Sequence, residues 1–267
     1  MLTAFRQVAL LVGLAGILAA PLPAVAGSFS GAYLAARQAQ FANDYSTAAR
    51  YFTIALTRDP SNISLMEELV LAQVALGQFE RAAVVARQME ANGHKSQIGQ
   101  MALAAVEGAE GAYDALIARA DAQRLMGDLV DRLVKAWALV GRGDMRAALI
   151  EFDAVTQASG TRAFGMYHKA LALALVGDLE AAEALFGAGQ PGTIIGARRG
   201  VVAHVQILSQ LGRTTEALAL LDARFGATQD PEIVQMRSKI TAGEGLRFDV
   251  LRGPKEGLAE VFFTIAG

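Results

Sequence analysis

Cysteine is absent from this chain of 267 residues, and proline and aromatic residues are scarce. The lack of cysteine excludes disulfide bonds, thiolate metal sites and cysteine nucleophiles, so the folded state depends on packing alone. Only 6 prolines are present, which leaves long stretches free to form helices. Aromatic residues make up 7% of the chain although 53% of it is hydrophobic, because the apolar content is mainly Ala, Leu and Val. This composition predicts an all-α fold of closely packed helices.

The chain also lacks an excess of basic charge. Its formal net charge is -2 and its isoelectric point is about 6.0. We expect no nucleic-acid partner, because binding to phosphates requires a concentrated basic face. Arg198 and Arg199 form the only prominent basic pair in the helical body, and we interpret them as the solvated start of a helix.

The first 26 residues have the order of a secretory signal. Arg6 is the only charge before an apolar run over Val8–Ala20, and a proline then precedes the small residues Ala24 and Ala26. The run has 13 residues, whereas a membrane-spanning helix needs about 20. We therefore expect a signal peptide over residues 1–26, cleavage after Ala26 and a periplasmic protein. The alternative is that this segment stays attached as a membrane anchor, which is the only membrane association we expect.

The remainder of the chain, residues 27–267, contains an internal repeat. Helical stretches alternate with short breaks at Asn43, Gly77, Gly111, Gly143, Gly177 and Gly212. A small residue follows most breaks by five positions, and in most cases a larger residue stands four positions later. These pairs are Ala48 with Phe52, Ala82 with Ala86, Ala148 with Phe152, Ala182 with Phe186, Ala217 with Leu221 and, after an insertion, Ala259 with Phe263. The offset between neighbouring pairs is 34 residues in two cases, and 66 residues separate Ala82 from Ala148.

These positions resemble the tetratricopeptide repeat, in which small residues stand where two helices cross and a proline closes each unit. The first unit matches best, with Asn43-Asp44-Tyr45, Ala48, Phe52, Ala55 and Pro60 at the family's spacing. The resemblance covers roughly residues 28–267. It implies an α-solenoid of about six to seven antiparallel helix pairs wound into a right-handed superhelix.

The physical chemistry of the repeat agrees with this resemblance. Ala at a crossing lets two helix axes approach closely, and Gly permits the positive φ that ends the first helix. Asp beside the glycine, as in Gly143-Asp144 and Gly177-Asp178, caps the second helix. Each pair leaves an apolar face that only the next pair can cover, so stability comes from stacking.

Three segments depart from the pattern. The unit around Ile98–Ala120 is short and rich in glycine, and we expect it to be distorted. The segment Gly243–Lys255 lengthens the last turn, and we expect a protruding loop there. Leu258–Ile265 is interpreted as an apolar second helix with no polar cap after it. It indicates either that the chain is the N-terminal part of a longer array or that this face docks on a partner.

No constellation of catalytic groups is evident in the sequence. The three histidines, His94, His168 and His204, lie in separate repeats without the spacing of metal ligands. Glu67 and Glu68 are neighbours in the sequence, but adjacent positions of a helix point in different directions. We therefore expect no enzyme activity, no cofactor and no metal site.

In the tetratricopeptide family the first helices of successive pairs line a concave groove. The resemblance places on this wall a set of residues suited to an extended or helical peptide with apolar anchors. Its members are Tyr33, Arg37, Phe41, Glu67, Leu71, Trp137, Phe164 and Tyr167, accompanied by Gln40, Val74, Leu133, Val140, Leu171, Val202 and Gln206. Two interpretations of the aromatic members are open, since they either fill the core between helices or face the groove. Trp137 and Tyr167 are the two that we expect to be exposed anchors.

The sequence thus predicts a protein–protein interaction scaffold or adaptor in the bacterial cell envelope, with a protein or peptide partner in the groove. The alternative is a docking arm of an enzyme, or of an envelope-assembly or secretion machine, whose active part lies elsewhere.

Overall fold

The computed structural model describes residues 29–122, 127–188 and 197–266, and in these ranges the chain folds into 14 α-helices without a strand. The helices are α1 (Phe29–Phe41), α2 (Tyr45–Leu56), α3 (Ile63–Ala75), α4 (Phe79–Ala91), α5 (Gln97–Glu110), α6 (Tyr113–Asp121), α7 (Asp128–Gly141), α8 (Met145–Gln157), α9 (Arg162–Leu175), α10 (Leu179–Gly187), α11 (Arg198–Gln210), α12 (Thr214–Phe225), α13 (Pro231–Thr241) and α14 (Pro254–Ala266). The all-α class predicted from the sequence is confirmed.

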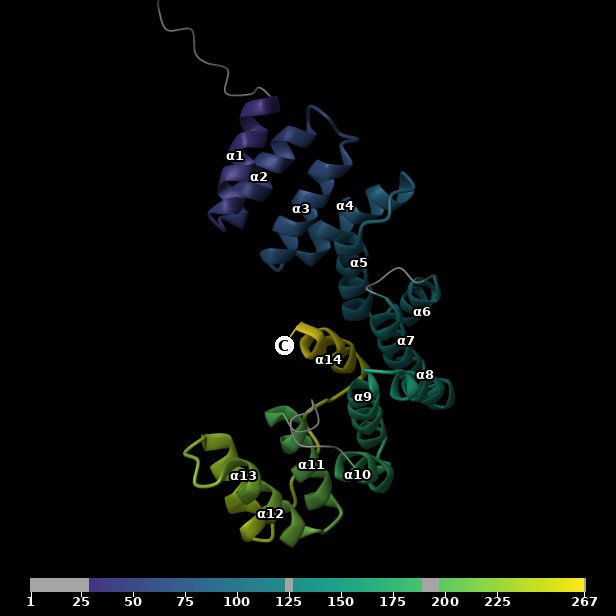
Figure 1. Ribbon diagram of the computed structural model, residues 1–267, viewed down its shortest axis with the longest axis vertical. Helices are drawn as coiled ribbons and strands as arrows, with labels where there is room; N and C mark the ends of the chain where they lie inside the picture. The colour runs from purple at the N-terminus through teal and green to yellow at the C-terminus, as the bar shows by residue number, and fades with distance from the viewer. Residues whose placement is uncertain (1–28, 123–126, 189–196, 267) are drawn as a thin grey trace, which may run out of the picture.

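Successive helices contact one another in the order of the sequence and form a curved array (Figure 1). Six helix pairs, from α1–α2 to α11–α12, are followed by α13. The α-solenoid predicted from the sequence is therefore confirmed. The helix α14 leaves the array and lies on its inner, concave side, where it contacts α5, α7 and α9.

The turn within each pair has the conformation that the sequence predicts. All six predicted breaks adopt a positive φ, from 57° at Asn43 to 90° at Gly177. Asp144 follows the break at Gly143, and its carboxylate accepts a hydrogen bond of 3.0 Å from the backbone N–H of Ala147. Asp44 and Asp178 cap α2 and α10 in the same way. These caps satisfy N–H groups that a helix leaves unpaired at its start.

The small residues of the repeat lie at helix crossings. Ala48, Ala82, Ala148, Ala182 and Ala217 are all fully buried, and their partners four positions later are buried as well. The third pair follows the same phase with different residues, because Leu116 and Ala120 are buried five and nine positions after Gly111. The 66-residue offset between Ala82 and Ala148 therefore contains a complete unit in which a large residue precedes a small one.

The third pair is nevertheless shortened, since α6 has only 9 residues. The side chain of Arg119 on α6 ties it to the preceding helices. Its Nη2 lies 2.6 Å from Glu107 Oε1 on α5, and its Nη1 lies 3.0 Å from Glu90 Oε1 on α4. A largely buried guanidinium with two carboxylates thus joins three consecutive helices.

The segment from Gly243 to Lys255 does not protrude, which corrects the prediction of a loop. Leu246, Val250 and Leu251 are buried. The Gln206 side chain on α11 pairs with residue 249 twice, since its amide donates to Asp249 Oδ1 at 2.6 Å and its carbonyl accepts from the Asp249 N–H at 3.0 Å. This segment is a strap that runs along α11 and delivers the chain to α14.

The assignment of Ala259 and Phe263 to the repeat phase is also wrong. Both are exposed, Phe263 by 64%, whereas Leu258 and Val261 are buried. The helix α14 contacts the concave face rather than the end of the array, so a different side of it is covered. The docking face proposed for Leu258–Ile265 lies against the chain's own helices.

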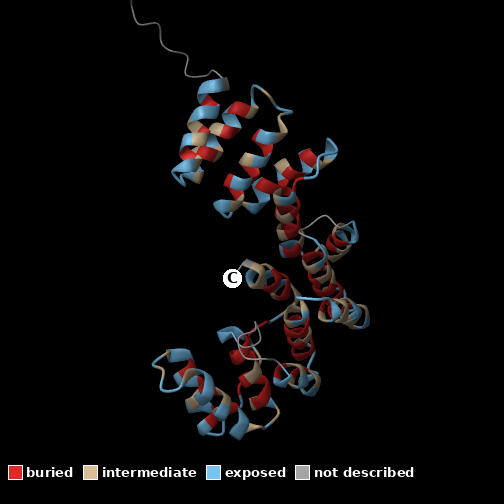
Figure 2. Ribbon diagram, in the orientation of Figure 1, coloured by how far each residue is buried: buried red, intermediate tan, exposed pale blue. Residues whose placement is uncertain are grey.

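Figure 2 shows that buried residues are densest along α7 and α9, the helices that α14 covers. The predicted signal peptide over residues 1–26 and its cleavage after Ala26 lie outside the described residues. Among the described helices, none combines the length and the hydrophobicity needed to cross a membrane.

Candidate binding groove

The concave face is lined by the first helices of successive pairs, because α14 contacts α5, α7 and α9, which open the third, fourth and fifth pairs. A close approach is formed between Gly257 on α14 and Trp137 on α7. A β-carbon at Gly257 would overlap the indole ring of Trp137. The glycine therefore permits a close crossing, at which α14 lies directly on the aromatic ring.

Trp137 is fully buried, so the prediction that it is an exposed anchor is wrong. Its ring packs edge to face on Phe152 of α8, with 5.7 Å between ring centroids. Its Nε1–H donates a hydrogen bond of 3.1 Å to His168 Nδ1. The physical reason for its burial is that α14 covers the side of α7 that a simple array would leave open.

The protonation of His168 follows from its partners. Nδ1 accepts from the indole, which is only a donor, so the neutral ring carries its proton on Nε2. Nε2 lies 3.1 Å from Thr264 Oγ1 on α14, and that hydroxyl donates onward to the backbone carbonyl of Glu260 at 2.8 Å. Burial lowers the pKa of His168 to about 3. This chain of hydrogen bonds joins α7, α9 and α14.

Tyr167 is also buried, which corrects the second predicted anchor. Its hydroxyl donates to Glu260 Oε1 at 2.7 Å, and Glu260 Oε2 accepts from Arg199 Nε at the same distance. Burial and the adjacent negative charge raise the pKa of Tyr167, so the phenol stays protonated and remains a donor. The Glu260 carboxylate, exposed by only 3%, is thus balanced by a hydroxyl and a cation.

Arg199 has a role that the sequence did not indicate. Besides Glu260, it binds the backbone carbonyl of Val250 in the strap at 2.8 Å. Arg199 stays exposed at the start of α11, in agreement with the interpretation as a solvated helix start, but its guanidinium also binds α14 and the strap. Arg198 points elsewhere and pairs with Asp230 and Glu232 near the start of α13.

Five of the predicted groove residues stay accessible on α1 and α3, the first helices of the first two pairs. Phe41 is exposed by 77%, and Tyr33, Glu67 and Leu71 are exposed as well. Arg37 is half-buried, lies over the ring of Phe41, and its Nη1 is 2.6 Å from Glu68 Oε1.

The structure thus separates the predicted residues into two groups. Tyr33, Arg37, Phe41, Glu67 and Leu71 remain accessible on α1 and α3, and we call this set the N-terminal groove after the groove predicted from the sequence. Trp137 and Tyr167 lie beneath α14, and Phe164 is half-buried and packs against the same core. The sequence did not predict that α14 would cover Trp137 and Tyr167. The features that could have indicated this docking are Gly257 and Glu260, a glycine and an acid at the apolar stretch of α14.

Among the residues that the structure describes, no three His, Asp or Glu side chains are grouped as metal ligands. Glu68 is engaged with Arg37, while Glu67 points to solvent, so the two do not act as a pair. No known protein family's sequence model matches the chain. No curated protein is significantly similar to it in sequence.

Proposed function

We propose that this chain is a tetratricopeptide-type interaction scaffold that is exported to the bacterial cell envelope and binds a segment of a partner protein on its concave face. One observation carries the proposal. A helix of 13 residues, α14, already lies on this face, and its crossing glycine, its acid and its hydroxyl each have a matching partner there. A face with this shape and these donors suits a helical ligand.

The N-terminal groove is the accessible continuation of that face. Tyr33, Phe41 and Leu71 offer large apolar surface on helices that belong to the same series as α5, α7 and α9. Aromatic side chains of this kind supply much of the binding energy in protein interfaces. The partner segment that fits is an amphipathic helix with apolar anchors, and the Arg37–Glu68 pair can position its polar side.

The test is affinity capture from the cell envelope with the native chain and a Tyr33→Ala, Phe41→Ala, Leu71→Ala variant. All three side chains are exposed, so the thermal melt should not change appreciably while partner recovery falls about tenfold or more. Ile150→Ala is the control, because Ile150 is also a large apolar residue, exposed by 65%, but lies on α8, the second helix of its pair. Equal recovery of the same partners by all three proteins would refute the groove proposal.

The export part of the proposal rests on residues 1–26 and has its own test. Sequencing the N-terminus of the exported protein should find a chain that starts at Gly27. A chain that still starts at Met1 would favour the membrane-anchored alternative.

A further inference from the structure

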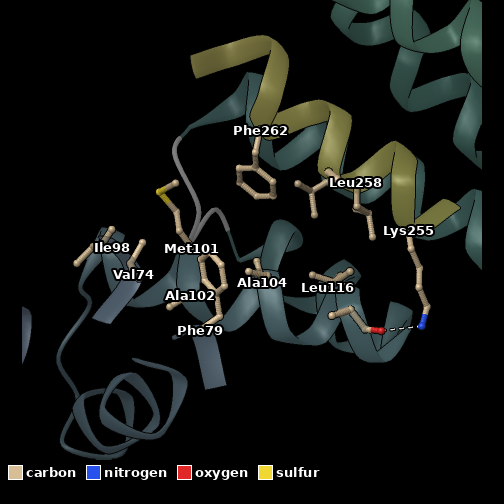
Figure 3. Close-up of a pocket in the computed structure, with 15 residues that line it drawn as sticks. Val74, Phe79, Ile98, Met101, Ala102, Ala104, Leu116, Lys255, Leu258 and Phe262 are labelled. Atoms are coloured by element: carbon tan, nitrogen blue, oxygen red, sulfur yellow. Dashed lines mark hydrogen bonds between the residues drawn. The ribbon is translucent and has the colours of Figure 1, made fainter. Parts of the chain in front are cut away.

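An apolar slot runs along α5 beneath α14 (Figure 3). Its floor is one face of α5 from Ile98 through Ala105 to Ala109, and its roof is formed by Leu258 and Phe262. The cavity has a volume of about 400 Å³. With one exception all of its lining residues are apolar, so water inside it finds almost no partner for hydrogen bonds.

The dimensions of the slot restrict what can enter. Ile98 and Ala109 are 11 positions apart, so at about 1.5 Å per residue the floor is about 16 Å long. Spread over that length, a volume of about 400 Å³ for the centres of water molecules corresponds to a channel about 8 Å wide once the radius of a water molecule is added. A helix with its side chains is about 10–12 Å wide and is excluded.

An extended peptide would be narrow enough but chemically unsuited. Its backbone N–H and C=O groups would face apolar walls, at a cost of about 1–3 kcal/mol for each group left unpaired. An unbranched hydrocarbon chain has no such groups. Each C–C bond of about 1.5 Å advances an extended chain by roughly 1.3 Å, so about 12 carbon atoms span the floor.

The exception in the lining is Lys255, which lies at one end of the slot, while Ile98 and Val74 lie at the other end (Figure 3). Its Nζ donates a hydrogen bond of 2.6 Å to the carbonyl of Ala109. The ammonium group of Lys255 has three N–H donors. Within the described residues, the bond to Ala109 is the one hydrogen bond recorded for it. The slot is thus apolar along its length and cationic at one end.

We propose that this slot binds an unbranched fatty acid of about 12 carbon atoms, with its carboxylate on Lys255 and its chain directed along α5 toward Ile98. This binding site shares no residue with the N-terminal groove, and its ligand does not depend on a protein partner.

The test is isothermal titration calorimetry of the full exported chain with sodium laurate below its micelle concentration. Wild-type protein should bind one laurate saturably. Lys255→Met keeps the apolar stem but removes the charge, so laurate should bind about tenfold more weakly while dodecyl alcohol binds unchanged. An equal loss for both ligands, or no loss for laurate, would contradict the assigned orientation.

Filling the slot is the second arm. Ala105→Phe on the floor and Ala259→Phe, beside the roof residue Leu258, should each abolish laurate binding. Ala259 is exposed, so its replacement leaves the core packing intact. Val84→Phe adds the same ring at an exposed position of α4 outside the slot and should bind like wild type. The proposal is overturned if wild type binds no laurate or if both slot variants bind it as Val84→Phe does. It is overturned equally if the protein floats with phosphatidylcholine vesicles but binds no free laurate.

Discussion

The crossing of Gly257 over Trp137 shows how one residue fixes the position of a helix. Any side chain at position 257 would have to displace either the indole ring or α14. Gly257→Ala should therefore destabilise the protein by about 1–3 kcal/mol through overpacking, as measured by urea unfolding. Gly245→Ala is the matched control, because a β-carbon at Gly245 meets no atom. The stability of this variant should be nearly that of wild type. Equal stability of the two variants would exclude the close crossing.

His168 gives the protein a predictable response to acid. Burial holds its folded-state pKa at about 3, below the value of about 6.5 in an unfolded chain. Between these values the unfolded state binds the additional proton, so stability is complete above pH 6.5 and falls as the pH is lowered toward 3. One such group changes the free energy of unfolding by about 1.4 kcal/mol per pH unit. Burial also lowers the pKa of His204, which adds to the effect with the same sign.

The measurement is urea unfolding of wild type and His168→Asn across this pH window. Asn retains an acceptor close to the position of Nδ1 but does not titrate, so the variant should lose less stability per pH unit. Parallel curves for the two proteins would show that His168 accepts a proton without unfolding.

At the level of elements, the side of α14 that faces the array combines apolar residues with two polar ones. Glu260 binds Tyr167, and Thr264 binds His168. Trp137 is the only tryptophan of the chain, and its fluorescence reports directly on whether α14 is docked. Val261→Asp puts a charge into a fully buried position of α14 and should undock the helix. The emission of Trp137 should then shift to longer wavelength and become accessible to acrylamide.

Phe263→Asp is the control for this experiment, since Phe263 is exposed on the same helix. Its fluorescence should match that of wild type. If Val261→Asp also leaves the emission unchanged, α14 does not cover Trp137 in solution.

The elements divide into those that local sequence predicts and those that it does not. The positive φ at the breaks and the caps by Asp44 and Asp144 arise from contacts within a few residues, so their pattern was readable. Leu116 obscured the third unit because it fills the place of an alanine. The docking of α14 depends on Gly257 meeting a ring on a helix far earlier in the chain, and periodicity within one helix contains no information about such a contact.

Contacts between distant parts of the chain also explain why the exposure of the candidate site residues was only partly predictable. Tyr33, Phe41 and Leu71 have exposed side chains on α1 and α3, whereas α14 lies on α5, α7 and α9. Trp137 and Tyr167 have the same phase but the opposite exposure. A helical repeat pattern predicts which face a residue occupies, but not what else the chain places on that face.

For the molecule as a whole, α14 changes how stability is distributed. One continuous core extends from Ala104 on α5 to Val261 on α14, whereas α1 and α2 share a separate cluster with α3. In an ordinary solenoid each repeat is stabilised only by its neighbours. Here the middle helices are also joined through α14, so they should unfold together.

Hydrogen exchange measured by mass spectrometry should show this directly. Amides of α7 and α9 should exchange only through a cooperative opening, while those of α1 and α2 should exchange through local openings of lower free energy. Val261→Asp should accelerate exchange in α7 and α9 and leave α1 and α2 unaffected. Uniform protection along the array would argue against a central cooperative unit.

The hydrogen bond between Tyr167 and Glu260 joins residues that are 93 positions apart. A ribosome therefore completes the pairs around α9 long before it has made the acid that pairs with this hydroxyl. Until α14 arrives, the indole of Trp137 and the hydroxyl of Tyr167 lack the helix that covers and pairs with them. Because contacts between distant residues form slowly, the arrival of α14 should be the slow step of folding, and the single tryptophan should become buried only at that step.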